Sequence, residues 1–390
     1  MDRFLLLTVA VLLYGSFEPW IFDFSKPGSS LLSLLTTWPR LDLYALRDAA
    51  VNLAMYFPLG ALAWMAAARR YSRTRAAVAA VAAAMALSTA AEWLQYYDRG
   101  RVGSAFDVTT NVLGSAAGAA AAMLFLSRFP GWQPARLNRR EAAAAALLLA
   151  GWVTYQAFPT YPMFHYAMLR AAWAQIAHPP SIAAVEVLAN AAEWLAAAVV
   201  LEAITGRMHI GWLLAAIAYL PLRLIMPNRG LRTEELLGAA LAALLCVVGS
   251  RAGFRPRVFA AAGLLLAALA LGELTPFHFS RSAQAVAWTP FRAAFTDGWP
   301  SVFPLWRKAY DYGAAACLLR LSGLSFRSAG FCLAAGLALC ATVQVWMPAR
   351  IPDASDATLA LVAGLGLAWL TGTPPGLRSH GGADVLQQAE

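Results

Sequence analysis

Apolar runs long enough to cross a membrane as helices recur along almost the whole chain. They consist mainly of Ala, Leu, Val and Gly, lack the alternating pattern of a membrane strand, and approach the roughly 20 residues that a helix needs to span a bilayer. Of 390 residues, 60% are hydrophobic and only 13% are charged, whereas soluble domains carry about 25% charged residues. The chain is therefore expected to be an all-α integral membrane protein.

The apolar pattern predicts a polytopic transmembrane helical bundle of about 12 spans. The expected spans are 4–20, 46–67, 75–97, 105–127, 141–158, 183–205, 210–226, 233–250, 256–274, 308–321, 328–347 and 356–372. Two have the weakest signal, because Pro221 and Arg223 interrupt one and Asp311 lies within the other. Ten or eleven spans are the alternative.

A polar module interrupts this apolar background three times. In each copy an arginine precedes an acidic residue by six positions: Arg101 and Asp107, Arg229 and Glu235, Arg350 and Asp356. The first copy also contains Glu92, Gln95 and Asn111, and the copy at 344–356 also contains Gln344 and Asp353. Ionisable groups among membrane-length apolar runs are costly, so their recurrence indicates a site.

The three modules close three similar stretches of chain, each with one span, a long aromatic connection and three more spans. We therefore expect a threefold repeated four-helix unit, with repeats at 1–130, 140–250 and 256–373 and a disordered tail at 374–390. Each connection contains a short amphipathic piece with one tryptophan, at 31–40, 166–176 and 285–295. These pieces are either interfacial helices or ordinary loops with anchoring aromatic residues.

Basic residues cluster in short loops at 69–75, 128–140 and 251–257. Because such loops stay in the cytoplasm, we expect a multi-pass protein of the bacterial inner (cytoplasmic) membrane, with both termini cytoplasmic and the polar modules facing outward. Arginine that faces anionic inner-leaflet lipid explains the +9 net charge. Membrane lipids are therefore the expected partners, and nucleic acid is excluded.

Cysteine and histidine give no sign of a metal site or a cofactor. The four cysteines fall within expected spans and have no CxxC spacing, and the five histidines are scattered without ligand spacing. The chain is expected to hold neither metal nor cofactor.

The polar residues of the first copy resemble a known family. The segment 47–60 contains Asp48, Asn52 and Pro58, and the module from Glu92 to Gly118 follows about thirty residues later. This order resembles the VanZ-like membrane protein family over about residues 40–127, and the second and third copies are degenerate. The resemblance implies a small helical membrane domain and an association with low-level resistance to the glycopeptide teicoplanin.

Helical spacing gathers these polar residues at one end of three spans. Asp48 and Asn52, like Asp107 and Asn111, are four positions apart and share a helix face, while Gly114 and Gly118 leave small surfaces that let helices approach closely. The candidate ligand-binding residues are Asp48, Asn52, Glu92, Gln95, Arg101, Asp107, Asn111, Arg229, Glu235, Gln344, Arg350, Asp353 and Asp356.

Three interpretations of the first copy are open. Its charges can neutralise one another as a structural latch. They can instead bind the head group of a lipid-linked glycan, a glycopeptide or an anionic lipid, with Arg101 on a phosphate or carboxylate and the acids and amides on hydroxyls or amines. This second interpretation predicts a role in envelope biogenesis or antibiotic susceptibility.

The third interpretation is a carboxylate-dependent enzyme or a proton-coupled transporter of envelope precursors. Glu92 then acts as an acid beside an ionised Asp107. For transport, Glu186, Asn190 and Glu193 supply a further polar face on the span at 183–205. Snorkelling or an interhelical hydrogen-bonded network is the preferred explanation of Glu186 and Glu193.

Overall fold

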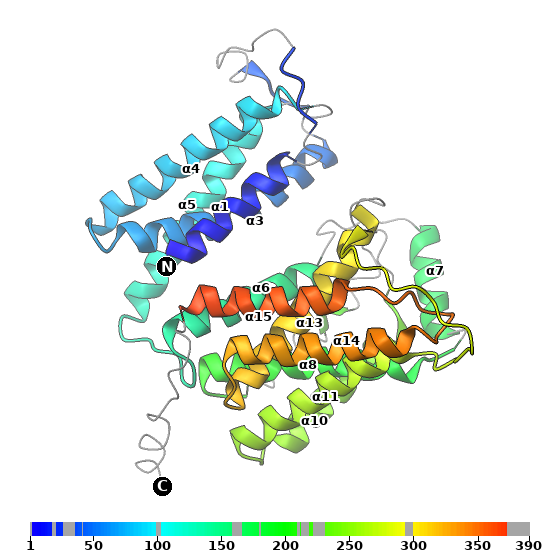
Figure 1. Cartoon of the computed structure of the whole chain (residues 1–390). Coiled ribbons are helices and arrows are strands. Elements are labelled where there is room, and N and C mark those ends of the chain that lie inside the picture. Colours follow the sequence, from blue (N-terminus) through cyan, green and yellow to red (C-terminus); the bar gives the residue numbers. More distant parts are fainter. Residues whose placement is uncertain are drawn as a thin grey trace. The chain divides into compact units, whose positions relative to one another are not determined.

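The computed structural model divides the chain into two compact units (Figure 1). The N-terminal unit is Met1–Gln133 and the C-terminal unit is Pro134–Glu390. The structure describes residues 2–17, 21–25, 36–40, 42–98, 103–157, 166–178, 181–208, 211, 218–220, 231–292 and 299–372. Over these residues the fold is all-helical, with two isolated β-bridges and no strand.

The helices follow the expected spans closely. The N-terminal unit contains α1 (Asp2–Phe17), α3 (Leu43–Ala67), α4 (Arg73–Gln95) and α5 (Ala105–Arg128). The C-terminal unit contains α6 (Arg139–Ala157), α7 (Tyr166–Ala177), α8 (Ala184–Thr205), α10 (Thr233–Gly249), α11 (Phe254–Leu274), α13 (Trp299–Leu321), α14 (Phe326–Gln344) and α15 (Ser355–Thr371). Most of the expected span at 210–226 lies outside the described residues, and so does the whole of the tail at 374–390.

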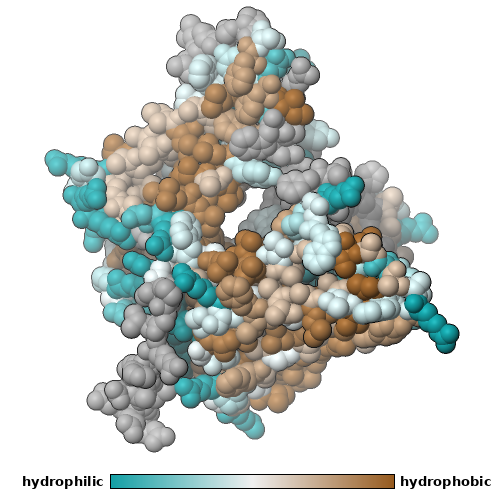
Figure 2. Space-filling view, in the orientation of Figure 1, coloured by the Kyte–Doolittle hydropathy of each residue, from teal (hydrophilic) through white to brown (hydrophobic). Residues whose placement is uncertain are grey.

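Six of the described helices are long and apolar enough to cross a membrane: α3, α4, α5, α8, α11 and α14. The shorter α15 is also apolar. Figure 2 shows hydrophobic residues exposed on the surface of both units, and large apolar side chains such as Leu124, Val248 and Leu339 are exposed. An apolar exterior of this kind is what a bilayer requires. The exact number of spans stays a prediction.

In the N-terminal unit, α3 and α5 meet backbone to backbone. A Cβ atom on Gly60 would lie 1.9 Å from the Ser115 carbonyl oxygen, and one on Gly118 would lie 1.9 Å from the Phe57 carbonyl oxygen. The close approach expected at Gly114 and Gly118 is therefore confirmed. Without a hydrophobic force between helices in lipid, such contact between small residues supplies much of the association energy.

In the C-terminal unit, α8 is the central helix. Its side chains are buried without a break from Asn190 to Val200, and it packs against α6, α10, α11 and α13. A helix that is buried on every side must satisfy its polar groups within the bundle. Glu193 and Glu202 on α8 therefore depend on partners from other helices.

The connections at the ends of α4 and α14 share a hydrogen-bond pattern. Gln95 Nε2 donates to the Ser16 carbonyl near the end of α1 (2.8 Å), and Gln344 Nε2 donates to the Glu273 carbonyl near the end of α11 (2.9 Å). In the same way Ala105 N donates to the Thr37 carbonyl, and the N–H of residue 354 donates to the carbonyl of residue 287, both at 3.1 Å.

The helix pairs in contact correspond as well. The N-terminal unit pairs α1 with α3 and α4, α3 with α4 and α5, and α4 with α5. The C-terminal unit pairs α11 with α13 and α14, α13 with α14 and α15, and α14 with α15. Because part of the stretch 140–250 lies outside the described residues, the threefold repeat stays a prediction.

The three amphipathic pieces differ from one another. Residues 166–176 are helical, as part of α7. The described part of 285–295 is an irregular segment in which Ala287 forms a bridge with Asp353, which agrees with the loop alternative. Residues 31–35 and 293–295 lie outside the described residues. Trp38, Trp173 and Trp288 are all exposed, as tryptophans at headgroup level would be.

Candidate functional site

The polar residues of the N-terminal unit hydrogen-bond across its helices. Asn52 Nδ2 on α3 donates to Asp107 Oδ1 (2.8 Å) and to Thr110 Oγ1 (3.3 Å) on α5. Asn111 Nδ2 on α5 donates to Ser88 Oγ on α4 (2.9 Å). These bonds connect all three helices. They do not test the latch interpretation, because Arg101, whose charge it pairs with Asp107, lies outside the described residues.

Glu92 and Gln95 also have hydrogen-bond partners within the N-terminal unit. Glu92 is buried and its Oε2 accepts a hydrogen bond from Ser104 N (3.1 Å), while Ser104 Oγ caps α5 by accepting from Asp107 N (3.1 Å). Asp48, by contrast, is exposed on α3. Arg101 lies outside the described residues, so the ligand-binding role of this group stays a prediction.

Two acids of the other modules begin helices. Glu235 Oε2 accepts from Arg232 N (3.1 Å) at the start of α10, and Asp353 Oδ1 accepts from Ser355 N (2.7 Å) at the start of α15. Carboxylates at such positions satisfy backbone N–H groups that the helix leaves unpaired. Arg229, which precedes Glu235 by six positions, lies outside the described residues.

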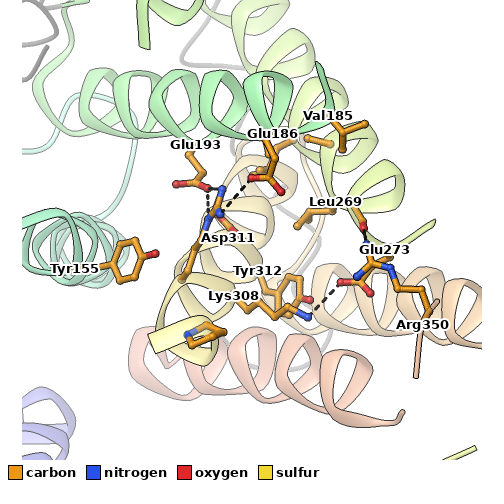
Figure 3. Close-up of a pocket in the computed structure, with 16 residues that line it drawn as sticks. Tyr155, Val185, Glu186, Glu193, Leu269, Glu273, Lys308, Asp311, Tyr312 and Arg350 are labelled. Atoms are coloured by element: carbon orange, nitrogen blue, oxygen red, sulfur yellow. Dashed lines mark hydrogen bonds and ion pairs between the residues drawn. The ribbon is translucent and has the colours of Figure 1, made fainter. Parts of the chain in front are cut away.

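A cavity of about 380 Å³ opens in the C-terminal unit between α6, α8, α11 and α13 (Figure 3). Its ionisable lining residues, apart from Tyr155 and Tyr312, are Glu186, Glu193, Glu273, Arg307, Lys308, Asp311 and Arg350. Val185 on α8 and Leu265 and Leu269 on α11 form an apolar part of the wall. The cavity thus combines charged groups of both signs with an apolar surface.

One ion pair connects α8 with α13. Arg307 Nε donates to Glu193 Oε1 at 2.6 Å, and a second guanidinium nitrogen contacts the same oxygen. Arg307 also lies 3.9 Å from Glu186 Oε2, although the Glu186 side chain is 41% exposed. The Glu193 side chain is 3% exposed, so its charge depends on Arg307 for compensation.

A second charged group connects α11, α13 and α15. Lys308 Nζ lies 2.7 Å from both carboxylate oxygens of Asp356 and 3.2 Å from Glu273 Oε1. Gln344 Nε2 donates to Glu273 Oε2 at 2.9 Å. The predicted residues Gln344 and Asp356 therefore belong to the network around the cavity.

Arg350 lines the cavity and binds the carboxyl end of α11. Its Nε donates to the Thr275 carbonyl at 2.6 Å, and a terminal nitrogen contacts the Gly272 carbonyl. A cation is favoured there, because the last carbonyls of a helix carry partial negative charge. No carboxylate of the described residues forms a salt bridge with Arg350, so its positive charge faces the cavity without an acidic partner there.

Asp311 is the carboxylate of the cavity with the fewest hydrogen-bond and ion-pair partners among the described residues. It is 7% exposed, and none of the described residues donates a hydrogen bond to its Oδ1 atom. Sequence reasoning used Asp311 only to weaken a predicted span, and it missed Glu273, Arg307 and Lys308. The sequence signal for these residues is the pair Arg307 and Lys308, which lies within four residues of Asp311 on one helix, α13.

Family comparison identifies the first part of the chain. Residues 4–126 match the family model described as VanZ/LLP1. The match contains the segment on which the resemblance rests and starts further toward the N-terminus, and it does not extend to the second and third copies. Searches of curated proteins and of solved structures found no match.

Proposed function

We propose that this VanZ-like membrane protein binds the polar head group of a cell-envelope molecule, such as an anionic lipid, a lipid-linked glycan or a glycopeptide. The observation that carries the proposal is the charged cavity between α6, α8, α11 and α13. Its volume of about 380 Å³ falls within the roughly 300–1,000 Å³ of small-molecule sites. Ionisable groups inside a membrane bundle are costly and typically mark such sites.

The position of the cavity supports binding from the non-cytoplasmic side. Glu186 lies in the first turn of α8 and Glu273 in the last turn of α11, and both line the cavity, so they lie at one end of the C-terminal bundle. Arg251 follows the end of α10, and Arg327 lies in the first turn of α14, so both lie at the other end of the bundle. Because arginine-rich short loops stay in the cytoplasm, the cavity opens away from it, in a protein of the bacterial inner membrane with cytoplasmic termini.

Arg350 is the residue that we assign to the anionic part of the head group. It lines the cavity, it is held by backbone carbonyls, and it retains donors for a phosphate or a carboxylate. The apolar wall formed by Val185, Leu265 and Leu269 then contacts the lipid part of the same molecule. The role that follows is in envelope biogenesis or in susceptibility to glycopeptides such as teicoplanin.

The alternative proposal is a carboxylate-dependent enzyme or a proton-coupled transporter of envelope precursors. It draws on the four carboxylates of the cavity, and above all on the buried Asp311. Head-group binding explains the carboxylates and also Arg350, which has no evident task in proton transfer. We therefore prefer binding.

Orientation is tested by labelling a cysteine at the mouth of the cavity. In a variant whose native cysteines are replaced by alanine, Glu186→Cys is expected to react with a membrane-impermeant maleimide in right-side-out vesicles, because the Glu186 side chain is 41% exposed. Arg251→Cys, at the opposite end, serves as the control and reacts only in inverted vesicles. The reverse pattern contradicts the outward orientation.

Head-group binding is tested by replacing Arg350. Native mass spectrometry of the purified chain with phosphatidylglycerol is expected to show about tenfold weaker retention for Arg350→Gln, since a charge-assisted hydrogen bond contributes about 1.5–3 kcal/mol. Arg350→Lys keeps the charge and recovers part of the retention. The matched control is Arg232→Gln, which removes an exposed arginine outside the cavity. Equal losses in Arg350→Gln and Arg232→Gln contradict the assignment.

A further inference from the structure

We infer that the cavity recognises a primary ammonium group, so that its ligand is an amphiphile with a zwitterionic head group of the ethanolamine phosphate class. The inference rests on the proposed function, because it places the phosphate of that head group at Arg350. It adds a second subsite of opposite charge, formed by Asp311 and Glu186.

The charges around the cavity do not balance. Four carboxylates and three cations line it, and Asp356, which pairs with Lys308, is a fifth carboxylate. The carboxylates therefore exceed the cations by two. Such an excess among membrane helices favours the binding of a cation, because charge interactions are poorly screened there.

The excess is located at Asp311 and Glu186. Lys308 is shared by Glu273 and Asp356, and Arg307 bonds to Glu193 at short range. Glu186 has a longer contact of 3.9 Å with Arg307. Asp311 is 7% exposed and its Oδ1 accepts no hydrogen bond from the described residues. A buried carboxylate without a donor is costly, and a ligand that donates to it removes this cost.

Figure 3 shows two sides of the cavity that differ in charge. Glu186, Glu193 and Asp311 lie together on one side, where Arg307 is the cation that pairs with Glu193, and Glu273, Lys308 and Arg350 lie on the other. Leu269 projects between the two groups. The first side therefore has two more carboxylates than cations, and on the second side Arg350 has no salt bridge to a carboxylate of the described residues. A molecule that carries a phosphate and an ammonium group joined by a short linker, next to an apolar tail, matches this arrangement.

The hydrogen-bond donors of the ligand decide the selectivity. A primary ammonium has three N–H donors, which the carboxylates of Asp311 and Glu186 can accept. A trimethylammonium group has the same charge but no donor, and a glycerol head group has hydroxyls but no positive charge. The site is therefore expected to select phosphatidylethanolamine over phosphatidylcholine and phosphatidylglycerol.

The test measures lipid retention by the purified full-length chain. Native mass spectrometry with an equimolar mixture of phosphatidylethanolamine, phosphatidylcholine and phosphatidylglycerol, all with the same acyl chains, is expected to show about tenfold preference for the first. Asp311→Asn is expected to reduce that preference at least fivefold, while retention of phosphatidylglycerol stays the same. Asp311→Glu keeps the carboxylate and the preference.

Two further variants separate recognition from folding. Glu186→Gln changes a partly exposed side chain, so it is expected to fold normally and still to lower the preference. The control is Glu141→Gln, which removes a buried carboxylate from its pair with Arg320 (2.9 Å). Neither residue lines the cavity, so the preference is expected to stay unchanged.

The outcomes distinguish this inference from the proposed function. Equal retention of phosphatidylethanolamine and phosphatidylcholine, with loss of both in Arg350→Gln, overturns ammonium recognition and leaves head-group binding in place. Retention that does not depend on Arg350, Asp311 or Glu186 overturns both. Soluble ethanolamine phosphate is expected to compete with the lipid. If it does not compete while the preference holds, recognition requires the lipid as a whole.

Discussion

Gly118→Leu is expected to prevent stable folding of the N-terminal unit. A Cβ atom at this position would lie 1.9 Å from the Phe57 carbonyl oxygen, 2.8 Å from its carbon and 3.1 Å from Ala61 N. All three atoms belong to the backbone of α3, so no side-chain rotation relieves the overlap and the two helices must separate. Overpacking alone costs about 1–3 kcal/mol, and we expect about 3 kcal/mol or more here.

The measurement is the thermal stability of the purified protein, followed by fluorescence-detected size-exclusion chromatography, together with the yield from membranes. Gly336→Leu on α14 is the matched control, because among the described residues no atom outside the local backbone of α14 lies within 4 Å of a Cβ atom built there. It is expected to keep the wild-type Tm within a few degrees. Similar losses in the two variants would show that α3 and α5 do not meet at Gly118.

The apolar pattern of the sequence located most helices of this fold. A segment that crosses lipid must pair its backbone N–H and C=O groups internally, and a long apolar helix does so. The start of α13 was predicted less well. The apolar signal suggests a span from residue 308, whereas the helix begins at Trp299. Pro304, Arg307 and Lys308 interrupt the signal, yet the two charges are compensated by Glu193 and Asp356 from other helices.

The site was predicted only in part, because a spacing along the chain does not determine partners across a bundle. The six-residue interval places Arg350 and Asp356 in one polar module but does not determine the partner of either residue. In the structure Asp356 pairs with Lys308, and Arg350 binds carbonyls at the end of α11. In the N-terminal unit, shared helix faces did indicate Asn52 and Asp107, which form a hydrogen bond between α3 and α5. Whether these N-terminal residues bind a ligand stays a prediction.

Arg307→Met is expected to destabilise the C-terminal unit by about 3–5 kcal/mol, the usual consequence of breaking a buried ion pair from one side. The Glu193 side chain is 3% exposed and would lose both contacts from the guanidinium. The thermal unfolding of the purified protein, or its denaturation in a detergent titration, measures the loss. A change below about 1 kcal/mol would mean that the pair is screened as a surface pair is.

The double variant Glu193→Gln/Arg307→Met is expected to recover most of this stability, because it removes both charges and leaves no unpaired carboxylate at position 193. It also leaves the charge balance of the cavity unchanged and keeps Asp311 and Arg350 in place. Lipid selectivity should therefore persist in the double variant, which would assign the Arg307–Glu193 pair to holding α13 against α8. If stability does not recover, Arg307 supports the fold through Glu186 or Asp311, and Glu193 is not its main partner.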